Sequence, residues 1–194
     1  MESTLSDKLK YGSVTLTFCA VLYLITNRIT LGLENTTHMF LKWELDIPRV
    51  PCFIILYTSF YLLLVLGFLS CPTRRELKIL SYQIILSSVI ACSCFLILPG
   101  ELGYTRMESA GVFQPIYGLL FVLDNPTNLF PSLHITLSYV ALFFALAQTK
   151  RFIWKTGLIL WFFGICASVI LVHQHHLFDI ATGLILGVFV RRII

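Results

Sequence analysis

The sequence contains few charged residues for its length. Among 194 residues, 12% are charged and 57% are apolar, and the mean hydropathy is +0.85. A soluble domain of average composition carries about 25% charged residues. We therefore expect a single membrane-embedded domain over residues 1–194, with residues 1–10 as a short cytoplasmic tail. Nucleic acid is excluded as a partner because the formal net charge of +4 is dispersed in short segments.

The sequence also lacks cysteine patterns, internal repeats and low-complexity stretches. Its six cysteines lie mostly within apolar runs, and none of their spacings is typical of a zinc site. We interpret them as small packing residues. The first apolar run follows Lys8 and Lys10, as in a signal peptide, but no small-x-small cleavage motif follows it. This run is therefore expected to be the first membrane helix.

Six apolar segments are long enough to be interpreted as membrane helices. They cover about residues 11–27, 51–70, 79–98, 128–148, 152–172 and 177–190. The predicted fold is an all-α, polytopic membrane bundle of six transmembrane helices. A shorter apolar stretch, residues 115–123, lies within a long connecting loop and is expected to rest on the membrane surface as a short amphipathic element.

The distribution of lysine and arginine predicts the orientation of these helices. With the N-terminus in the cytoplasm, the outer side holds only Arg28, Lys42, Arg49 and Arg106. The inner side holds Lys8, Lys10, Arg74, Arg75, Lys78, Lys150, Arg151, Lys155, Arg191 and Arg192. Both termini are therefore predicted to be cytoplasmic, and three loops, residues 28–50, 99–127 and 173–176, to face outward.

Four of the five histidines fall at the predicted outer ends of the last three helices. His134 stands at the start of the fourth helix, and His173, His175 and His176 stand between the fifth and sixth. The topology rests on charge alone, yet it places both groups on one side of the membrane. His38, in the first outer loop, is expected to be a bystander, and His173 and His176 are less certain members of the site.

Each group has a chemical interpretation. Pro131 suits the first turn of a helix, and the N–H groups that follow it, with the Ser132 hydroxyl, would form an anion site at the positive end of the helix dipole. His175 and Asp179 are four residues apart, so on a helix they would share a face. The carboxylate would fix the imidazole tautomer and leave the other ring nitrogen as nucleophile or base. His134 could then serve as a general acid.

These residues also carry a family resemblance. Pro131-Ser-Leu-His134 and Ser168-x6-His175-x3-Asp179 resemble the second and third signature motifs of the type 2 phosphatidic acid phosphatase superfamily. The Phe-Pro-Ser-Leu-His form, and the segment Leu45-Asp-Ile-Pro48 before an apolar run with Tyr57, are most similar to the inositol phosphorylceramide synthase-like branch. The resemblance covers most of the chain from about residue 40, and the six-helix layout agrees with the family fold.

The resemblance implies a mechanism without metal or cofactor. His175 would attack phosphorus and form a phosphohistidine, Asp179 would orient it, and His134 would protonate the departing oxygen. Ser132 and Arg106 would hold the phosphate.

The chain departs from the family pattern at several positions. Val169 stands where the phosphatase branch has arginine, and Leu133 stands where its second motif has glycine. The first motif, Lys-x6-Arg-Pro, is absent from the loop before the fourth helix. Lys42 and Arg49 have that spacing but lie in another loop and lack the proline. Arg106 is therefore the best candidate for the missing cation.

The sequence thus predicts a lipid phosphate phosphohydrolase acting at the outer or lumenal leaflet, with a lipid phosphate and the bilayer as its partners. One alternative is a phosphotransferase that moves a phospho-headgroup to another alcohol. Two others are a histidine-rich, metal-dependent membrane enzyme and a non-catalytic lipid-binding scaffold. The membrane is a bacterial inner membrane, with a periplasmic site, or a plasma or secretory membrane of a eukaryote.

Overall fold

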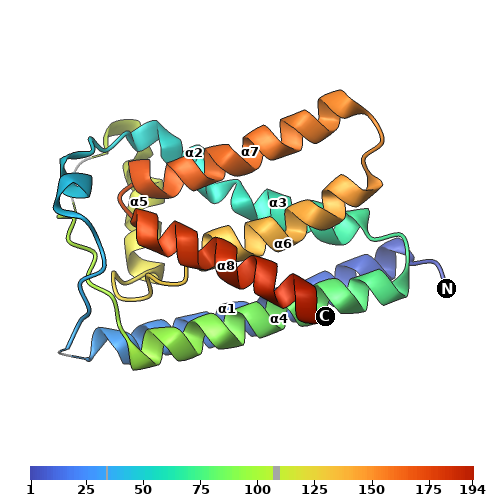
Figure 1. The fold of residues 1–194 in the computed structure, drawn as a ribbon, viewed down its shortest axis with the longest axis horizontal. Coiled ribbons are helices and arrows are strands. Elements are labelled where there is room, and N and C mark those ends of the chain that lie inside the picture. The colour runs from blue at the N-terminus through green and yellow to red at the C-terminus, as the bar shows by residue number, and fades with distance from the viewer. Residues whose placement is uncertain (34, 107–109) are drawn as a thin grey trace.

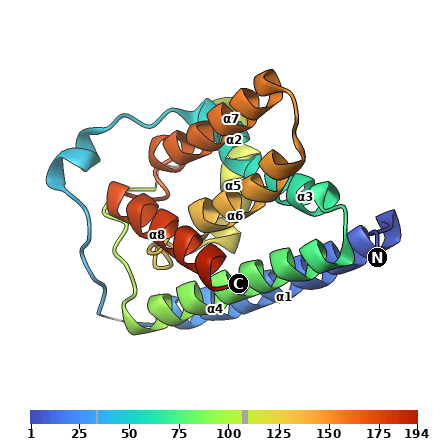
Figure 2. The ribbon, with the colours of Figure 1, turned by 45° about the vertical axis from the view of Figure 1, so that its right-hand side comes forward.

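The computed structural model describes residues 1–33, 35–106 and 110–194, and within them the fold is all-helical with no strand. The long helices lie alongside one another in a bundle (Figures 1 and 2). The α-helices are α1 (Leu5–Leu31), α2 (Ile54–Thr58), α3 (Phe60–Ser70), α4 (Arg74–Ile97), α5 (Gln114–Leu123), α6 (Leu133–Gln148), α7 (Phe152–Leu171) and α8 (Leu177–Ile193). Short 3-10 turns are η1 (Lys42–Asp46), η2 (Pro51–Phe53) and η3 (Gly111–Phe113).

All six predicted segments are helical over most of their length, and four of the helical spans are long and apolar enough to cross a membrane. These are Leu5–Leu31, Pro51–Ser70, Arg74–Ile97 and Phe152–Leu171. The second span is built from η2, α2 and α3 and is interrupted at Ser59, whose hydroxyl donates to the Leu56 carbonyl at 2.5 Å. Helices α6 and α8 are shorter, with 16 and 17 residues. Six crossings with cytoplasmic termini therefore remain a prediction.

The start of the fourth predicted helix was placed too early. Helix α6 begins at Leu133 rather than near residue 128, because Ser132 has extended backbone angles (φ −62°, ψ 112°) and acts as the N-cap. Pro131 consequently precedes the helix instead of occupying its first turn. The residues from 124 to 131 form a connecting loop that carries polar groups toward α6.

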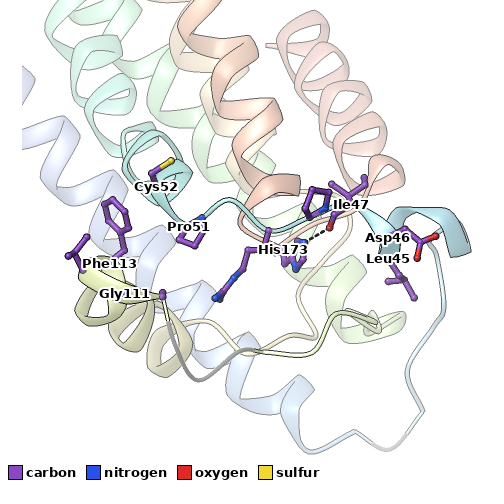
Figure 3. A pocket seen from close by; sticks show the side chains of 12 residues that line it. Leu45, Asp46, Ile47, Pro51, Cys52, Gly111, Phe113 and His173 are labelled. Atoms are coloured by element: carbon purple, nitrogen blue, oxygen red, sulfur yellow. Dashed lines mark hydrogen bonds between the residues drawn. The ribbon is translucent and has the colours of Figure 1, made fainter.

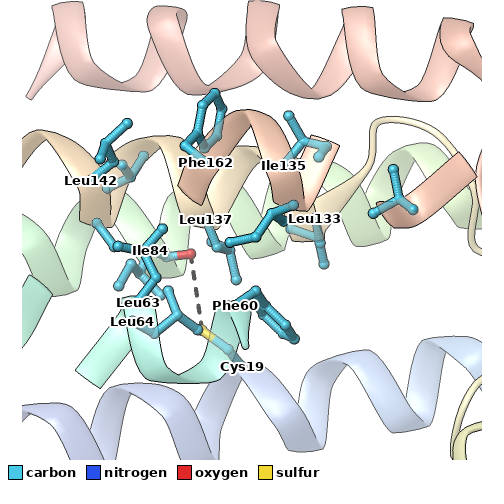
Figure 4. Packing of buried hydrophobic residues seen from close by; sticks show 14 of the residues in the cluster. Cys19, Phe60, Leu63, Leu64, Ile84, Leu133, Ile135, Leu137, Leu142 and Phe162 are labelled. Carbon is cyan, nitrogen blue, oxygen red and sulfur yellow. Dashed lines mark hydrogen bonds between the residues drawn. The ribbon is translucent and has the colours of Figure 1, made fainter. Parts of the chain in front are cut away.

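Helix α6 lies at the centre of the bundle. It packs against α3, α4, α7 and α8, while α1 packs mainly along α4. Leu63, Ile84 and Leu137 meet in the core between these helices (Figure 4). Many large apolar side chains instead face outward, such as Phe152 and Phe163 of α7. Such a surface suits contact with lipid better than contact with water.

The cysteines have the predicted packing role only in part. All six are free, and Cys19, Cys71 and Cys92 are buried among apolar side chains. Cys19 also contacts the Ile84 carbonyl in the core (Figure 4). Cys52, in contrast, is exposed.

Helix α5 contains the whole of the short apolar stretch, residues 115–123, that was expected to form an amphipathic element. It lies across one end of the bundle, roughly perpendicular to the long helices (Figure 1). Tyr117 is buried against the bundle, whereas Leu119 and Val122 are exposed. A helix with one buried aromatic side chain and an exposed apolar face is suited to a membrane interface.

The three loops predicted to face outward gather at the same end of the bundle as α5 (Figures 1 and 2). The N-terminus and the connections before α4 and α7 lie at the opposite end (Figure 1). The topology inferred from charge is therefore consistent with the arrangement of the helices. The end that carries the outer loops also carries the histidines.

Candidate active site

Two imidazole rings meet at this end of the bundle. His134 lies in the first turn of α6 and His175 in the turn between α7 and α8. Their ring centroids are 5.6 Å apart and the rings are inclined at 65°. His175 Nδ1 lies 3.3 Å from Oδ2 of Asp179, and both side chains are buried. Because Nδ1 faces the carboxylate, Nε2 is the nitrogen that can act on a bound group.

Asp179 is held by the helix that it begins. It is the third residue of α8, and its carboxylate accepts the backbone N–H of the N-cap residue, His176, at 2.8 Å. An acidic side chain in the first turn also interacts favourably with the positive end of the helix dipole. We expected His175 and Asp179 to share one face of a helix. This was wrong, because α8 begins at Leu177, after His175. The turn brings His175 to Asp179 instead.

The backbone of α7 fixes His175 from the other side. The Val169 carbonyl accepts the N–H groups of Gln174 at 3.0 Å and of His175 at 3.1 Å. Ser168, the first residue of the third motif, donates its hydroxyl to the Ile165 carbonyl at 2.7 Å. Val169 is fully buried and contributes no cation. The end of α7 therefore positions the histidine without adding a phosphate donor.

Aromatic side chains of the second apolar span surround His134. The rings of Tyr57 and Phe60 each lie 4.4 Å from the His134 ring, centroid to centroid. Tyr57 is buried, and its hydroxyl has no hydrogen-bond partner among the described residues. A buried, unsatisfied hydroxyl is costly unless a ligand or water bonds to it. Tyr57 was noted in the sequence only as part of the family resemblance, and the structure places it beside the histidine pair.

The beginning of α6 presents several unused donors. Ser132 is fully buried, and its Oγ has no partner within the described part of the chain. Although Ser132 is the N-cap residue, its side chain makes no capping hydrogen bond, so the leading N–H groups of α6 receive no side-chain acceptor from it. Asn128 Nδ2 is likewise buried and unpartnered, while its Oδ1 accepts the Thr30 hydroxyl at 2.7 Å. An anion at this helix end would satisfy these donors.

Close contact between α6 and α8 joins Ser132 to Asp179. The Ser132 N–H donates to the Asp179 carbonyl at 3.1 Å, and the Thr136 hydroxyl donates to the Gly183 carbonyl at 2.9 Å. A Cβ atom on Gly183 would lie only 2.7 Å from the Ser132 carbonyl oxygen. Glycine therefore permits the approach that sets the two motifs against each other.

The Arg106 side chain is hydrogen-bonded to the C-terminal end of α5. Its guanidinium donates to the carbonyls of Phe121, at 3.3 Å, and of Asp124, and it lies over the Phe121 ring. Its Nε is buried without a hydrogen-bond partner among the described residues, and burial lowers its pKa. None of these contacts reaches the histidine pair. Arg106 thus keeps one donor for a ligand while supporting the loop before α6.

Asp124 is a partly buried acid that the sequence interpretation gave no role. Its side chain accepts the hydroxyl of Tyr23 from α1. Burial raises its pKa, and the bond from Tyr23 and the charges of His175 and Arg106 oppose that shift. Its position in the sequence, after an apolar stretch, gave no sign of this contact, because α1 supplies the partner from a distant part of the chain.

The remaining histidines hold the outer loops together. His173 Nε2 lies 2.9 Å from the Ile47 carbonyl, and His176 Nε2 lies 2.5 Å from the Leu102 carbonyl. Their rings stack on either side of Tyr104, at 4.0 and 4.7 Å. The stack continues from His176 to Phe40 at 4.5 Å, and Phe40 contacts His38 at 3.8 Å. We call these rings (His173, Tyr104, His176, Phe40 and His38) the ring stack.

This arrangement bears on the alternative of a metal centre. The rings of His173 and His176 are engaged with loop carbonyls rather than directed at the His175 side chain. Within residues 1–33, 35–106 and 110–194, no group of three or more His, Cys, Asp or Glu side chains is placed to hold a metal ion. Although these histidines are close together in the sequence, the described structure does not direct their side chains toward one metal ion.

Glu44 was missed by the sequence interpretation. It is 1% exposed, and its two carboxylate oxygens accept the N–H groups of Leu41 at 2.9 Å and of Leu177 at 2.8 Å. His176 Nδ1 lies 3.3 Å from its Oε2. Glu44 thus joins the first outer loop to the first turn of α8. One glutamate in a polar loop carries no signal for this role in a single sequence.

An open groove lies between residues 45–52 and residues 110–113, with His173 in its lining (Figure 3). Its volume is about 790 Å³, and its lining is chiefly apolar, with Ile47, Pro51 and Phe113 among its walls. Arg49 and His173 line both this groove and a much smaller cavity that also meets Arg106 and Gln174. Gln174 directly precedes His175 in the chain.

Comparison with known families gives one finding. The model of the PAP2 superfamily matches residues 108–194, a region that contains α5 to α8 and the residues Ser132, His134, His175 and Asp179. Comparisons with curated proteins and with solved structures give no match. The apolar helices and the family match together indicate an integral membrane protein of phosphatase-like type. A little under half of the chain, including its histidine motifs, is therefore similar to the PAP2 superfamily.

Proposed function

We propose that the chain is a PAP2-type membrane phosphatase that removes phosphate from a lipid phosphate or diphosphate at the outer or lumenal leaflet. The observation that carries this proposal is the apposition of His134 and His175, 5.6 Å apart, with Asp179 on Nδ1 of His175. A nucleophile must lie about 3 Å from phosphorus, and an acid within about 3 Å of the leaving oxygen. Two imidazoles at this separation are suited to act on opposite sides of one phosphoryl group.

In the first step, Nε2 of His175 attacks phosphorus, and the bond between phosphorus and the lipid oxygen breaks. Protonated His134 gives its proton to that oxygen, so the lipid leaves as an alcohol. Asp179 accepts the Nδ1–H bond and stabilises the positive charge that develops on His175. Ser132 Oγ and the leading N–H groups of α6 receive the phosphoryl oxygens.

In the second step, a water molecule attacks the phosphohistidine. Neutral His134 takes the proton from this water while its oxygen bonds to phosphorus. The bond between phosphorus and Nε2 breaks, inorganic phosphate leaves, and both histidines return to their starting states. The same group is therefore acid in one step and base in the next.

A phosphotransferase is the second candidate. If an alcohol replaces water in the second step, the product is a phosphodiester instead of inorganic phosphate. The segment Leu45-Asp-Ile-Pro48, which resembles the inositol phosphorylceramide synthase-like branch, forms part of the groove wall. This position favours a role of that segment in recognising a lipid or an acceptor.

The test uses purified full-length protein in detergent micelles with ³²P-labelled lipid phosphates. We expect phosphate release that survives EDTA and is inhibited by vanadate, and its loss in His175→Ala. Wild-type protein quenched in base during the first turnovers should retain label that is stable to base and labile to acid, as phosphohistidine is, and His175→Ala should retain none. His38→Ala is the matched control, because it removes an imidazole from the exposed end of the ring stack and should leave turnover unchanged.

The other outcomes distinguish the alternatives. Labelled phosphodiester formed on addition of an alcohol acceptor, at the expense of free phosphate, would favour the transferase. Activity that EDTA abolishes would replace the proposal with a metal-dependent enzyme. Full activity of His175→Ala would refute the nucleophile, and absence of turnover with every lipid phosphate would favour a binding protein.

A further inference from the structure

The groove beside the site has the chemistry of a lipid-binding surface. Its walls are mainly apolar, and the side chains that carry charge are Arg49, Asp46 and, when protonated, His173. Residues 111–113, which lead directly into α5, form one wall, and residues 45–52 form the other (Figure 3). Since α5 continues into exposed apolar residues such as Leu119, the groove lies beside a surface suited to the membrane interface.

A small cavity adjoins the groove and reaches Gln174, the residue before His175. Arg49 and His173 line both the groove and the small cavity beyond it, and Arg106 and Gln174 line the far side of that cavity. The cavity has a volume of about 10 Å³, which accommodates about one water molecule. This small cavity is therefore lined by both arginines and by the residue that precedes His175.

Two arginines at one narrow point favour an anion. The side chain of Arg49 lies over the Tyr117 ring, 5.1 Å from its centroid, and Arg106 has a buried Nε without a hydrogen-bond partner in the described chain. Guanidinium groups bind phosphate oxygens in fork geometry, so a cavity lined by two of them favours a negatively charged group. A phosphoryl group is larger than this cavity. It can therefore enter only if the long Arg49 side chain moves and widens the cavity.

We propose that the groove holds the apolar carbon chain next to the phosphate of the substrate, and that Arg49 is the first cation to bind that phosphate. This inference rests on the proposed function and narrows its substrate class. The occupant is a lipid phosphate whose apolar carbons directly follow the ester oxygen, rather than a lipid with a sugar headgroup. A polyol would leave its hydroxyl groups unpaired against the apolar walls, which is unfavourable. Arg49 from the first outer loop would supply the cation that Val169 does not.

The kinetic test compares Arg49→Ala with Lys42→Ala, which removes a cation of the same loop that is exposed and outside the groove. For a lipid phosphate we expect KM of Arg49→Ala to rise roughly tenfold or more with a smaller change in kcat, and Lys42→Ala to match the wild type. Arg49→Lys should restore part of the affinity. Asp46→Asn, which removes the negative charge of the groove, should lower KM.

A second variant tests the groove without altering a charge. Cys52→Trp places a large ring at an exposed position in the groove wall. It should raise KM for a long-chain lipid phosphate several-fold, and by clearly more than it raises KM for soluble p-nitrophenyl phosphate. Equal KM values for the long-chain substrate in Cys52→Trp and wild type would overturn the assignment of the groove.

A binding test does not depend on turnover. The rate at which a maleimide modifies Cys52 is measured in His175→Ala, with Cys52→Ser in the same background to identify the label. A non-hydrolysable lipid phosphonate should slow this modification several-fold, while the corresponding lipid alcohol should have a much weaker effect. Adding Arg49→Ala should remove the difference between phosphonate and alcohol.

These arms separate the two proposals. If the wild type releases no phosphate but the phosphonate protects Cys52 through Arg49, the proposed function fails and the binding site stands. If phosphate is released but neither Arg49→Ala nor the phosphonate has the expected effect, the function stands and this inference is refuted. Stronger protection by a sugar-bearing phospholipid than by the phosphonate would also overturn the substrate class.

Discussion

Replacing Gly183 with alanine tests whether contact between α6 and α8 sets the geometry of the site. The new Cβ would lie 2.7 Å from the Ser132 carbonyl oxygen, 3.3 Å from the Ser132 nitrogen and 3.2 Å from Cβ of Ile135. Two of these atoms belong to the backbone and cannot rotate away. The helices must therefore separate by roughly 0.7–1 Å to restore ordinary contact distances.

That separation has both an energetic and a catalytic consequence. Overpacking costs about 1–3 kcal/mol, and weakening the hydrogen bonds from Ser132 N–H and from the Thr136 hydroxyl adds about 1 kcal/mol each. The helical preference of alanine offsets up to about 1 kcal/mol. We expect a net loss of stability of roughly 2–5 kcal/mol. Since Asp179 moves with α8 and His134 with α6, kcat should fall by about tenfold to hundredfold.

The assay measures kcat for a lipid phosphate together with the thermal unfolding midpoint in detergent. Gly157→Ala is the matched control, because a Cβ at this exposed position of α7 meets nothing within 4 Å. It should leave kcat unchanged and not lower the midpoint. If Gly183→Ala behaves like Gly157→Ala in both measurements, the contact does not set the site and our reasoning about it is refuted.

Three further predictions concern the acids and histidines of this end of the bundle. Asp179→Asn should lower kcat by roughly 10²–10⁴-fold, because the amide cannot hold His175 in the same tautomer; a loss below threefold in steady-state kinetics would contradict the assigned role. Burial lowers the pKa of His173 from 6.5, so the folded state resists protonation, and stability should decline as pH falls below about 6.5. Thermal unfolding between pH 7.5 and 5.5 should show a smaller decline for His173→Gln, and an equal decline would argue against this account. Glu44→Ala should destabilise the protein by about 2–4 kcal/mol, measured by denaturant unfolding, because it leaves the N–H groups of Leu41 and Leu177 without their acceptor; a change within about 0.5 kcal/mol would contradict that role.

Much of the fold could be predicted because membrane helices have a strong signal. The apolar runs identified all six long helical segments, and the apolar stretch within residues 115–123 corresponds to α5. The predicted helix boundaries were less accurate where a capping residue determines the end of the helix. Ser132, rather than Pro131, determines where α6 begins, and apolar character alone does not distinguish the end of a loop from the start of a helix.

The meeting of His134 with His175 could be anticipated because the two helix ends had to lie on the same side of the bundle. The surroundings of these residues could not be. Tyr57, Asp124 and Glu44 reach this end of the bundle through contacts between segments far apart in the sequence. A single sequence does not specify those contacts. Arg49 was noted in the sequence for its spacing from Lys42, and the structure places it at the groove instead.

The ring stack has a consequence for attempts to change substrate preference. Its members come from the first outer loop, from the segment before α5 and from the turn that carries His175. Replacing one of these segments with that of a relative would leave the rings of the other two segments without their stacking partners, next to the turn that carries His175. These three segments therefore depend on one another, and a chimaera designed to transfer substrate selectivity must exchange all three together.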